Sequence, residues 1–214
     1  GIDTLSEYAT AFGLGQSTGI ELGEETGVLA GPEHSAAVNQ MWYGGNTVQA
    51  AIGQSDHLFT PLQLASYIAT LVRGGTRYDA HLLKSVTAYD GSEILYEHEP
   101  EVLSEVEISA STLSAVKEGM YSLTTSGSLA RYFKDCIVSA GAKTGTAQIN
   151  ENTTNNGVFV CFAPYEDPEI ALAIVIERGG SGSALASTAV EILNAYFADS
   201  DIGTAMIPEG SLLP

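Results

Sequence analysis

The chain has 214 residues and a mass of 22.4 kDa, and 44% of its residues are hydrophobic, which is enough for one domain with a substantial core. Eight Lys and Arg residues stand against 26 Asp and Glu residues, so the formal net charge is −18 with His neutral. This charge excludes binding to the phosphate backbone of nucleic acids as the main activity, and it argues against docking on anionic lipids.

The first predicted element is an amphipathic helix near the N-terminus. Its apolar residues recur at helical spacing, and Gly13 after them suits a left-handed C-terminal cap. These apolar residues are Leu5, Tyr8, Ala9 and Phe12. Residues 13–33 are rich in Gly, Thr and Glu and are predicted to form a loop.

The second predicted helix has a strong start signal at Thr60-Pro61-Leu62-Gln63. Thr60 is a helix cap, Pro61 suits the first helical position, and Gln63 is placed to complete a capping box. The helix is predicted to end at Gly74-Gly75.

A β-hairpin is predicted over residues 83–97, where residues 86–89 and 93–96 flank Asp90-Gly91, a pair favoured in two-residue turns. Residues 85–116 hold seven acidic residues and no Lys or Arg. We interpret them as a solvated face and not as a cation site, because no calcium-binding loop pattern occurs.

Two further helices are predicted before the last third of the chain. One follows Ser111 and carries Leu113, Val116 and Met120, and a short one follows Ser126.

The last third is predicted to contain three strands, at residues 137–149, 157–163 and 170–177. The links at 150–156 and 164–168 are short, which indicates an antiparallel meander. A closing helix is predicted over residues 187–197, with Val190, Leu193, Asn194 and Phe197 on one stripe. The fold class is therefore α+β, an antiparallel sheet covered by helices.

The cysteines and histidines suggest neither a disulfide nor a metal site. Cys136 and Cys161 are predicted to be unpaired, because a hairpin centred near residue 153 would set Cys161 opposite residue 144 or 145 and leave Cys136 roughly 25 Å away. The four histidines show no metal-ligand spacing, so no metal and no cofactor are expected. They are His34, His57, His81 and His98.

The most informative segment is residues 141–148, with the sequence Gly-Ala-Lys-Thr-Gly-Thr-Ala-Gln. Small residues in a strand let a ligand or another backbone approach closely, and Lys143 adds a positive charge beside that gap. Such a strand suits a peptide-like ligand that bears a carboxylate. The alternative is an ordinary edge strand in which Lys143 guards against aggregation.

Lys143-Thr144-Gly145-Thr146 resembles the Lys-Thr-Gly element of penicillin-binding proteins and serine β-lactamases. Further segments, in order along the chain, resemble class B penicillin-binding proteins, the monofunctional peptidoglycan transpeptidases. They are Tyr8-Ala9-x-x-Phe12-Gly13-Leu14-Gly15, Thr18-Gly19-Ile20, Trp42, Gly45-Asn46-Thr47, Ile52-Gly53-Gln54, Thr60-Pro61-Leu62-Gln63 and Gly119-Met120. The chain departs from the family at Asn46, which is usually Asp, and at Ser55, which is usually Gly.

The resemblance implies a partial penicillin-binding/β-lactamase-like transpeptidase fold and gives four residues a role. Lys143 would supply positive potential for the substrate carboxylate and tune proton transfer, and the hydroxyls of Thr144 and Thr146 would bind that carboxylate. Gly145 would leave room for the ligand backbone. The Thr146 N–H would form half of an oxyanion hole.

The family's nucleophile, the Ser of Ser-x-x-Lys, and its Ser-x-Asn motif are not found where the resemblance would place them. Ser-x-Asn occurs nowhere in the sequence, and the one Ser-x-x-Lys, at Ser114–Lys117, falls where the family has a structural helix. We therefore expect residues 1–214 to be the C-terminal portion of one transpeptidase domain, inactive alone. The parent protein is expected to be extracytoplasmic and anchored in the membrane by an N-terminal segment outside this chain.

The expected function of the parent is cross-linking of stem peptides in cell-wall synthesis by serine acyl transfer. Its partners would be the D-Ala-D-Ala end of peptidoglycan stem peptides, β-lactams and other cell-wall synthesis proteins, and the chain alone is expected to self-associate. Two alternatives stay open: a non-catalytic penicillin sensor or scaffold, and a β-lactamase or DD-carboxypeptidase relative. The Thr-Pro-Leu-Gln run and the acidic insert around residues 85–110 favour the transpeptidase over the latter.

Overall fold

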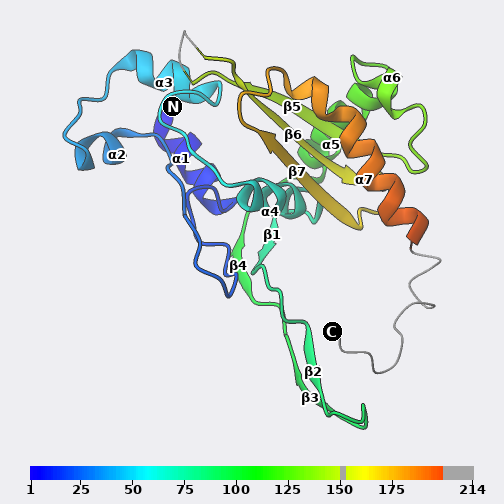
Figure 1. Cartoon of the computed structure of the whole chain (residues 1–214). Helices are drawn as coiled ribbons and strands as arrows, with labels where there is room; N and C mark the ends of the chain where they lie inside the picture. The colour runs from blue at the N-terminus through cyan, green and yellow to red at the C-terminus, as the bar shows by residue number, and fades with distance from the viewer. Residues whose placement is uncertain (150–152, 200–214) are drawn as a thin grey trace.

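A three-stranded antiparallel sheet forms the centre of the computed structural model, which describes residues 1–149 and 153–199. Its strands are β5 (Gly141–Ala147), β6 (Asn156–Ala163) and β7 (Ile170–Ile176), in the order β5-β6-β7. Helices cover both faces (Figure 1). The predicted α+β class and antiparallel meander are confirmed.

The central strand β6 divides the core into two clusters because successive side chains of a strand point to opposite faces. Phe159 and Cys161 pack with α6 (Ala130–Phe133), the 3₁₀ helix η1 (Gly182–Leu185) and α7 (Ala186–Asp199). Val160 and Phe162 pack on the other face with α4 (Pro61–Val72) and α5 (Ala110–Thr125). Phe159 and Phe162 are fully buried.

The helix boundaries confirm the predicted caps in most places. Helix α1 (Ile2–Ala11) ends just before Gly13, whose φ is +87°. At the start of α4, the Thr60 hydroxyl accepts the Gln63 N–H at 3.1 Å, and the Gln63 side chain accepts the Thr60 N–H at 3.0 Å. Helix α5 begins earlier than predicted, because the cap is Ser109 and not Ser111.

The predicted first strand, 137–149, was too long at both ends. The chain before Gly141 is held by the Asn194 side chain and the Tyr165 backbone instead of the sheet. The Ile137 N–H donates to Asn194 of α7 at 2.9 Å, and the carbonyl of Ser139 accepts the Tyr165 N–H at 3.0 Å. Part of the predicted 150–156 loop lies outside the described residues.

Both cysteines are free, as predicted, but their predicted separation was wrong. Cys161 pairs with Ala142 in the β5–β6 ladder and not with residue 144 or 145. The chain before β5 then brings Cys136 against the cluster that contains Cys161. Burial raises the pKa of the Cys161 thiol to about 12, and the neighbouring Cys136 adds to that rise.

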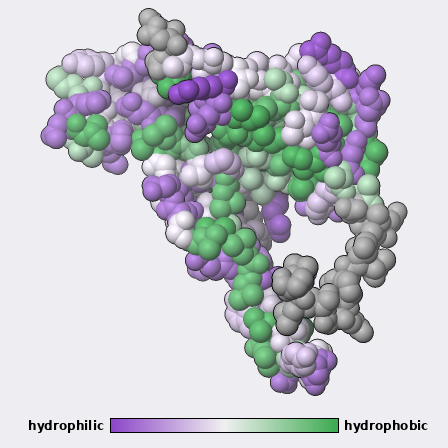
Figure 2. Space-filling model, in the orientation of Figure 1, coloured by the Kyte–Doolittle hydropathy of each residue, from purple (hydrophilic) through white to green (hydrophobic). Residues whose placement is uncertain are grey.

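The predicted hairpin at 83–97 is present as β2 (Ser85–Thr87) and β3 (Ile94–Glu97). Its turn is longer than the predicted two residues, because the Ala88 N–H donates to the Glu93 carbonyl and closes a four-residue loop. We call residues 82–97 the arm. It projects away from the sheet in Figure 1 and exposes apolar residues along its length (Figure 2).

Several elements were not predicted from the sequence: β1 (Thr76–Tyr78), which pairs with β4 (Val102–Glu105), and the helices α2 (Pro32–Ala37) and α3 (Gly44–Ala51). The β1–β4 pair joins the arm to α4. In the described part of the chain no helix is both long and apolar enough to cross a membrane.

Glu24 organises the loop that follows α1. Its carboxylate accepts hydrogen bonds from the Ser17 hydroxyl at 2.5 Å, from the hydroxyl and N–H of Thr18 at 2.7 and 2.9 Å, and from the Gly19 N–H at 3.3 Å. Burial would raise the pKa of Glu24, but these hydrogen bonds together outweigh it and hold the pKa below its usual range. The buried Arg77 guanidinium donates to the carbonyl of Ser17 in the same loop.

Glu24→Gln is expected to lower the free energy of unfolding at pH 7 by about 1–2 kcal/mol, because hydrogen bonds to a charged acceptor are lost. A pKa lowered in the folded state stabilises fully above the unfolded pKa, about 4.3, and the stabilisation is lost as pH falls through the folded pKa. The gap between the variant and the wild type should therefore close in thermal melts taken from pH 7 to below pH 4. The exposed neighbour provides the control, since Glu25→Gln should change stability by less than about 0.5 kcal/mol. A gap that stays constant with pH would contradict this role for the charge.

Candidate functional site

The Lys-Thr-Gly-Thr segment lies on strand β5, at the edge of the sheet. β5 pairs with β6 on one side, and the described residues contribute no strand on its other side. An unpaired strand edge offers backbone N–H and C=O groups to an extended ligand. The predicted strand location of the segment is confirmed.

The pleat of β5 sets Lys143 and Gly145 on one face of the sheet and Thr144 and Thr146 on the other. The Lys143 side chain is exposed, and its ammonium donates to the carbonyl of Thr144 at 2.7 Å. Within residues 1–149 and 153–199, no carboxylate forms an ion pair with it. Its positive charge is therefore available to a ligand.

The backbone of β5 is backed closely by η1. A Cβ on Gly182 would collide with the backbone carbonyls of both Gly145 and Val158. A Cβ on Gly145 would lie 3.3 Å from the Cβ of Val158. Close packing of this kind leaves the strand little room to shift, so it presents Lys143 and Thr146 from a fixed position.

A polar cleft of about 640 Å³ opens at the end of β5, within the usual size range of small-molecule sites. One wall comes from the end of the strand and the other from α3 and the loop after it. The lining residues are Asn46, Gln49, Ile52, Gln54, Ser55, Asp56, Thr146, Gln148, Ile149 and Asn155. Thr146 thus faces the same space as residues about 90 positions earlier in the chain.

Sequence reasoning did not identify this second wall as part of a site. Ile52-Gly53-Gln54 and Asn46 appeared only as segments of the resemblance, and no site role was predicted for Gln49 or Asp56. Asn46 has a local role: its side-chain oxygen accepts the Tyr43 N–H at 2.9 Å and completes a capping box at the start of α3. An Asp carboxylate would accept the same bond, so the departure at Asn46 is conservative.

The departure at Ser55 has a structural cost. Ser55 has a φ of +64°, the left-handed region that favours glycine, which is the residue the family usually has there. Its hydroxyl is buried and has no hydrogen-bond partner among the described residues. The loop wall of the cleft is therefore held in a conformation that its own sequence disfavours.

The loop continues into His57, which has a structural role. Its Nδ1 accepts the Ala30 N–H at 3.1 Å, and burial lowers the pKa of His57 although the Ala50 carbonyl and Asp56 oppose that shift. A neutral imidazole used as a backbone acceptor is not free to act as a general base, so Ser-His-Asp chemistry finds no support here.

Ser114 and Lys117 on α5 do not form a nucleophile and base pair. The Lys117 ammonium lies over the rings of Phe162 and Tyr165, 5.6 and 5.3 Å from their centroids. Ser114 is exposed, and the described residues show no hydrogen bond between the two. Lys117 thus covers an aromatic cluster, in agreement with the prediction that Ser114–Lys117 belongs to a structural helix.

A second groove, of about 440 Å³, runs between α5 and β5. It is mostly apolar and is lined by Val116, Gly119, Met120, Leu123, Ala142, Lys143 and Thr144. Lys143 therefore lines the apolar groove, whereas Thr146, three positions along the same strand, lines the polar cleft. A larger open cleft, of about 900 Å³, lies beside α1, but Asp3, Glu7 and Glu33 line it and make it unsuitable for a carboxylate.

Comparisons with known proteins agree with the resemblance. Residues 1–197 match the family model of the penicillin binding protein transpeptidase domain. The chain belongs to this family.

Curated and solved relatives carry related names. The chain is 34% identical, over 91% of its length, to the peptidoglycan D,D-transpeptidase MrdA of Escherichia coli strain K12, of which it covers 33%. Penicillin-binding protein 2B of Streptococcus pneumoniae strain R6 matches with a TM-score of 0.77 and 26% identity over 96% of this chain and 33% of that one. PBP2 in its complex with MreC from Helicobacter pylori matches with a TM-score of 0.75 and 27% identity, over 92% and 36% of the two chains.

The chain therefore spans about a third of the length of these relatives. The predicted family and the penicillin-binding transpeptidase fold are confirmed. The roles of Lys143, Thr144, Gly145 and Thr146 remain predictions, as does the division of the domain into this chain and an absent front part.

Ser55→Gly is expected to raise the free energy of unfolding by about 1 kcal/mol. It removes the left-handed strain and the unpaired hydroxyl, and the greater entropy of unfolded glycine offsets part of the gain. Ser55→Ala is the matched control, because it removes the hydroxyl but keeps the strained φ. In urea unfolding its stability should therefore fall between that of the wild type and that of the Ser55→Gly variant. A Ser55→Gly protein less stable than the wild type would contradict this account of the loop.

Proposed function

We propose that the chain is part of a serine-type peptidoglycan D,D-transpeptidase and that β5 is the wall of its active site that receives the substrate's terminal carboxylate. The observation that carries the proposal is the edge strand β5, on which Lys143 has no ion-pair partner among residues 1–149 and 153–199 and Thr146, three positions later, lines the polar cleft. The names of the relatives favour this function over a sensor, a β-lactamase or a carboxypeptidase.

In this proposal, each residue of the segment contributes to recognition or to charge stabilisation. The Lys143 ammonium attracts the carboxylate of a D-Ala-D-Ala stem peptide, and the hydroxyls of Thr144 and Thr146 donate hydrogen bonds to it. Gly145 lets the peptide backbone approach the strand. The Thr146 N–H stabilises the oxyanion that forms on the attacked carbonyl.

The attacking serine and its lysine base lie in the longer protein, outside these 214 residues. The serine oxygen adds to the carbonyl of the penultimate D-Ala, its proton passes to the base, and the terminal D-Ala leaves as the amine. The amine of a neighbouring stem peptide then attacks the acyl-enzyme and releases the serine, which forms the cross-link. A β-lactam opens its ring on the same serine and retains its leaving group, so the acyl-enzyme persists.

The proposed substrate also determines where in the cell the protein acts. Peptidoglycan is assembled outside the cytoplasmic membrane, so we place the protein there, anchored by a segment that is not part of this chain. The solved complex of PBP2 with MreC makes a protein similar to MreC our candidate partner.

The 214-residue chain is expected to form no covalent adduct with a fluorescent penicillin under conditions that label an intact transpeptidase. The reason is that its one Ser-x-x-Lys, Ser114–Lys117, has its lysine on aromatic rings and not on the serine. Intact-mass spectrometry and gel fluorescence measure the outcome. A mass increase of one penicillin that disappears in Ser114→Ala would show that Ser114 is a nucleophile and would overturn our placement of the site.

In the longer protein, Lys143→Met is expected to slow acylation by penicillin by about 10²-fold or more, the scale seen when one electrostatic stabiliser is removed from an active site. Lys134→Met is the matched control. Lys134 is exposed and does not line the cleft, and among the described residues its ammonium has one ion pair, at 3.8 Å with Asp135, so this variant should acylate at the wild-type rate. Equal acylation rates in the two variants would exclude Lys143 from the site.

A further inference from the structure

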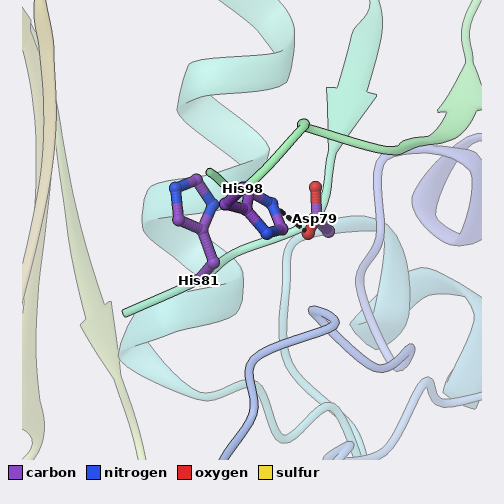
Figure 3. Close-up of side chains that lie close together, drawn as sticks. All are labelled: Asp79, His81 and His98. Atoms are coloured by element: carbon purple, nitrogen blue, oxygen red, sulfur yellow. Dashed lines mark ion pairs between the residues drawn. The ribbon is translucent and has the colours of Figure 1, made fainter. Parts of the chain in front are cut away.

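Three side chains that can bind metal ions converge where the arm leaves the body of the protein (Figure 3). Asp79 follows β1, His81 comes two residues later, and His98 follows β3 on the returning chain. One ligand atom from each lies within 4.8 Å of the others. The two chain segments that carry them enter and leave the arm, so a bound ion would join both.

Backbone hydrogen bonds above and below the cluster fix these two segments. The Asp79 N–H donates to the Glu101 carbonyl at 3.0 Å, and the His98 N–H donates to the Lys84 carbonyl at 2.8 Å. Residues 79 and 81 alternate along an extended chain, so their side chains share a face and meet His98 from the opposite segment. The three side chains thus lie between the Asp79–Glu101 and the Lys84–His98 backbone hydrogen bonds.

The two oxygens of the Asp79 carboxylate face different partners, and Oδ2 is the one directed at His98. Its Oδ1 accepts the Glu101 N–H at 2.7 Å, while Oδ2 lies 2.9 Å from Nε2 of His98. Ligating carboxylates in metal sites are commonly held by a hydrogen bond of this kind.

The ring of His98 is arranged in a similar way. Its Nδ1 lies 3.4 Å from the Tyr96 hydroxyl, a partner that directs Nε2 toward Asp79. Nε2 lies at ion-pair distance from Asp79 Oδ2, and this buried nitrogen has no hydrogen-bond partner among residues 1–149 and 153–199. A metal ion bound by both atoms would satisfy the buried nitrogen and the facing carboxylate oxygen together.

His81 completes the set from the solvent side. Its ring stacks on that of His98, with centroids 3.8 Å apart and planes 26° apart. The chain after it is anchored, because the Glu21 carboxylate accepts the N–H groups of Leu82 at 2.9 Å and of Leu83 at 3.1 Å. His81 is exposed, so its ring is free to turn its nitrogen toward an ion placed between the other two ligands.

From this geometry we propose that Asp79, His81 and His98 bind one Zn²⁺ ion that clamps the base of the arm. Two imidazoles and one carboxylate are a ligand set that zinc accepts, with water in the fourth position. The acidic surroundings, seven acids and no Lys or Arg over residues 85–116, favour a divalent cation. The sequence-based expectation of no metal overlooked this set, because its members lie on both sides of the hairpin.

The first test is zinc binding by the purified 214-residue chain, measured by equilibrium dialysis with ZnCl₂ alone. We expect one Zn²⁺ per chain and an affinity at least about 10-fold weaker in His81→Ala and in His98→Gln. His34→Gln is the matched control, because it removes one imidazole from α2, remote in sequence from the cluster, and it should leave binding unchanged. Because His81 is exposed, His81→Ala tests the site even if His98→Gln fails to fold.

The second test asks whether the ion holds the arm. Trypsin cleavage after the exposed Lys84 requires the Lys84–His98 backbone pair to open. Zn²⁺ should therefore slow this cleavage in the wild type and in His34→Gln but not in His81→Ala. Absence of zinc binding, equal weakening in His34→Gln, or zinc binding without slower cleavage at Lys84 would each overturn the proposed clamp.

Discussion

The buried side-chain amide of Gln63 joins helix α4 to the loop that follows α1. Its oxygen accepts the Thr60 N–H, and its nitrogen donates to the carbonyls of Gln16 and Thr26 at 2.7 and 2.8 Å. Gln63 is 1% exposed, so water cannot take the place of these hydrogen bonds if one of them is lost.

Helix α4 packs on the sheet, and Gln63 ties its first turn to the loop after α1. Val28 in that loop pairs with Leu58 in both directions, at 2.7 and 2.9 Å, which holds the segment leading from the wall of the cleft. The cleft beside β5 thus depends on an amide far from its lining.

The net charge of −18 limits how this chain can attract a ligand that bears a carboxylate. At long range the protein repels a carboxylate, but salt screens that repulsion beyond about 8 Å. A ligand that reaches β5 meets the exposed Lys143 ammonium, with which no carboxylate of the described residues forms an ion pair, although Asp56 lines the polar cleft at the end of the strand. Recognition therefore rests on local contacts with the strand edge, where an extended backbone can pair, and not on steering by the whole protein. The fixed position of β5 against Gly182 matters for the same reason, since local contacts require accurate placement.

The parts of the fold that the sequence predicts are those determined by neighbours along the chain. The Thr60–Gln63 cap and the strand predicted at residues 157–163 involve residues a few positions apart, and both are present. The start of β5 was misplaced because Ile137 bonds to Asn194, 57 residues away. The register that sets Cys161 against Ala142 depends on the length of a loop, which composition alone does not give. For the site, the strand was found from its unusual lysine and small residues. The wall that includes Gln49 and Asp56 was missed because only tertiary contacts bring it to Thr146.

The arm is held in place by polar contacts at its base and not by burial of its apolar side chains. Val86, Ile94 and Tyr96 are 40%, 60% and 46% exposed, so the hairpin gains little from burial, and an isolated two-stranded hairpin is marginal in water. Its orientation is set at its base, by the bonds of Asp79 to Glu101, of Lys84 to His98, and of Glu21 to Leu82 and Leu83. All of these are polar contacts near solvent, each worth about 1 kcal/mol in net terms. A position determined by so few contacts is sensitive to anything that joins the two strands of the base. The side chains of Asp79, His81 and His98 lie at that point, so the chemistry of the base and the placement of the arm are coupled.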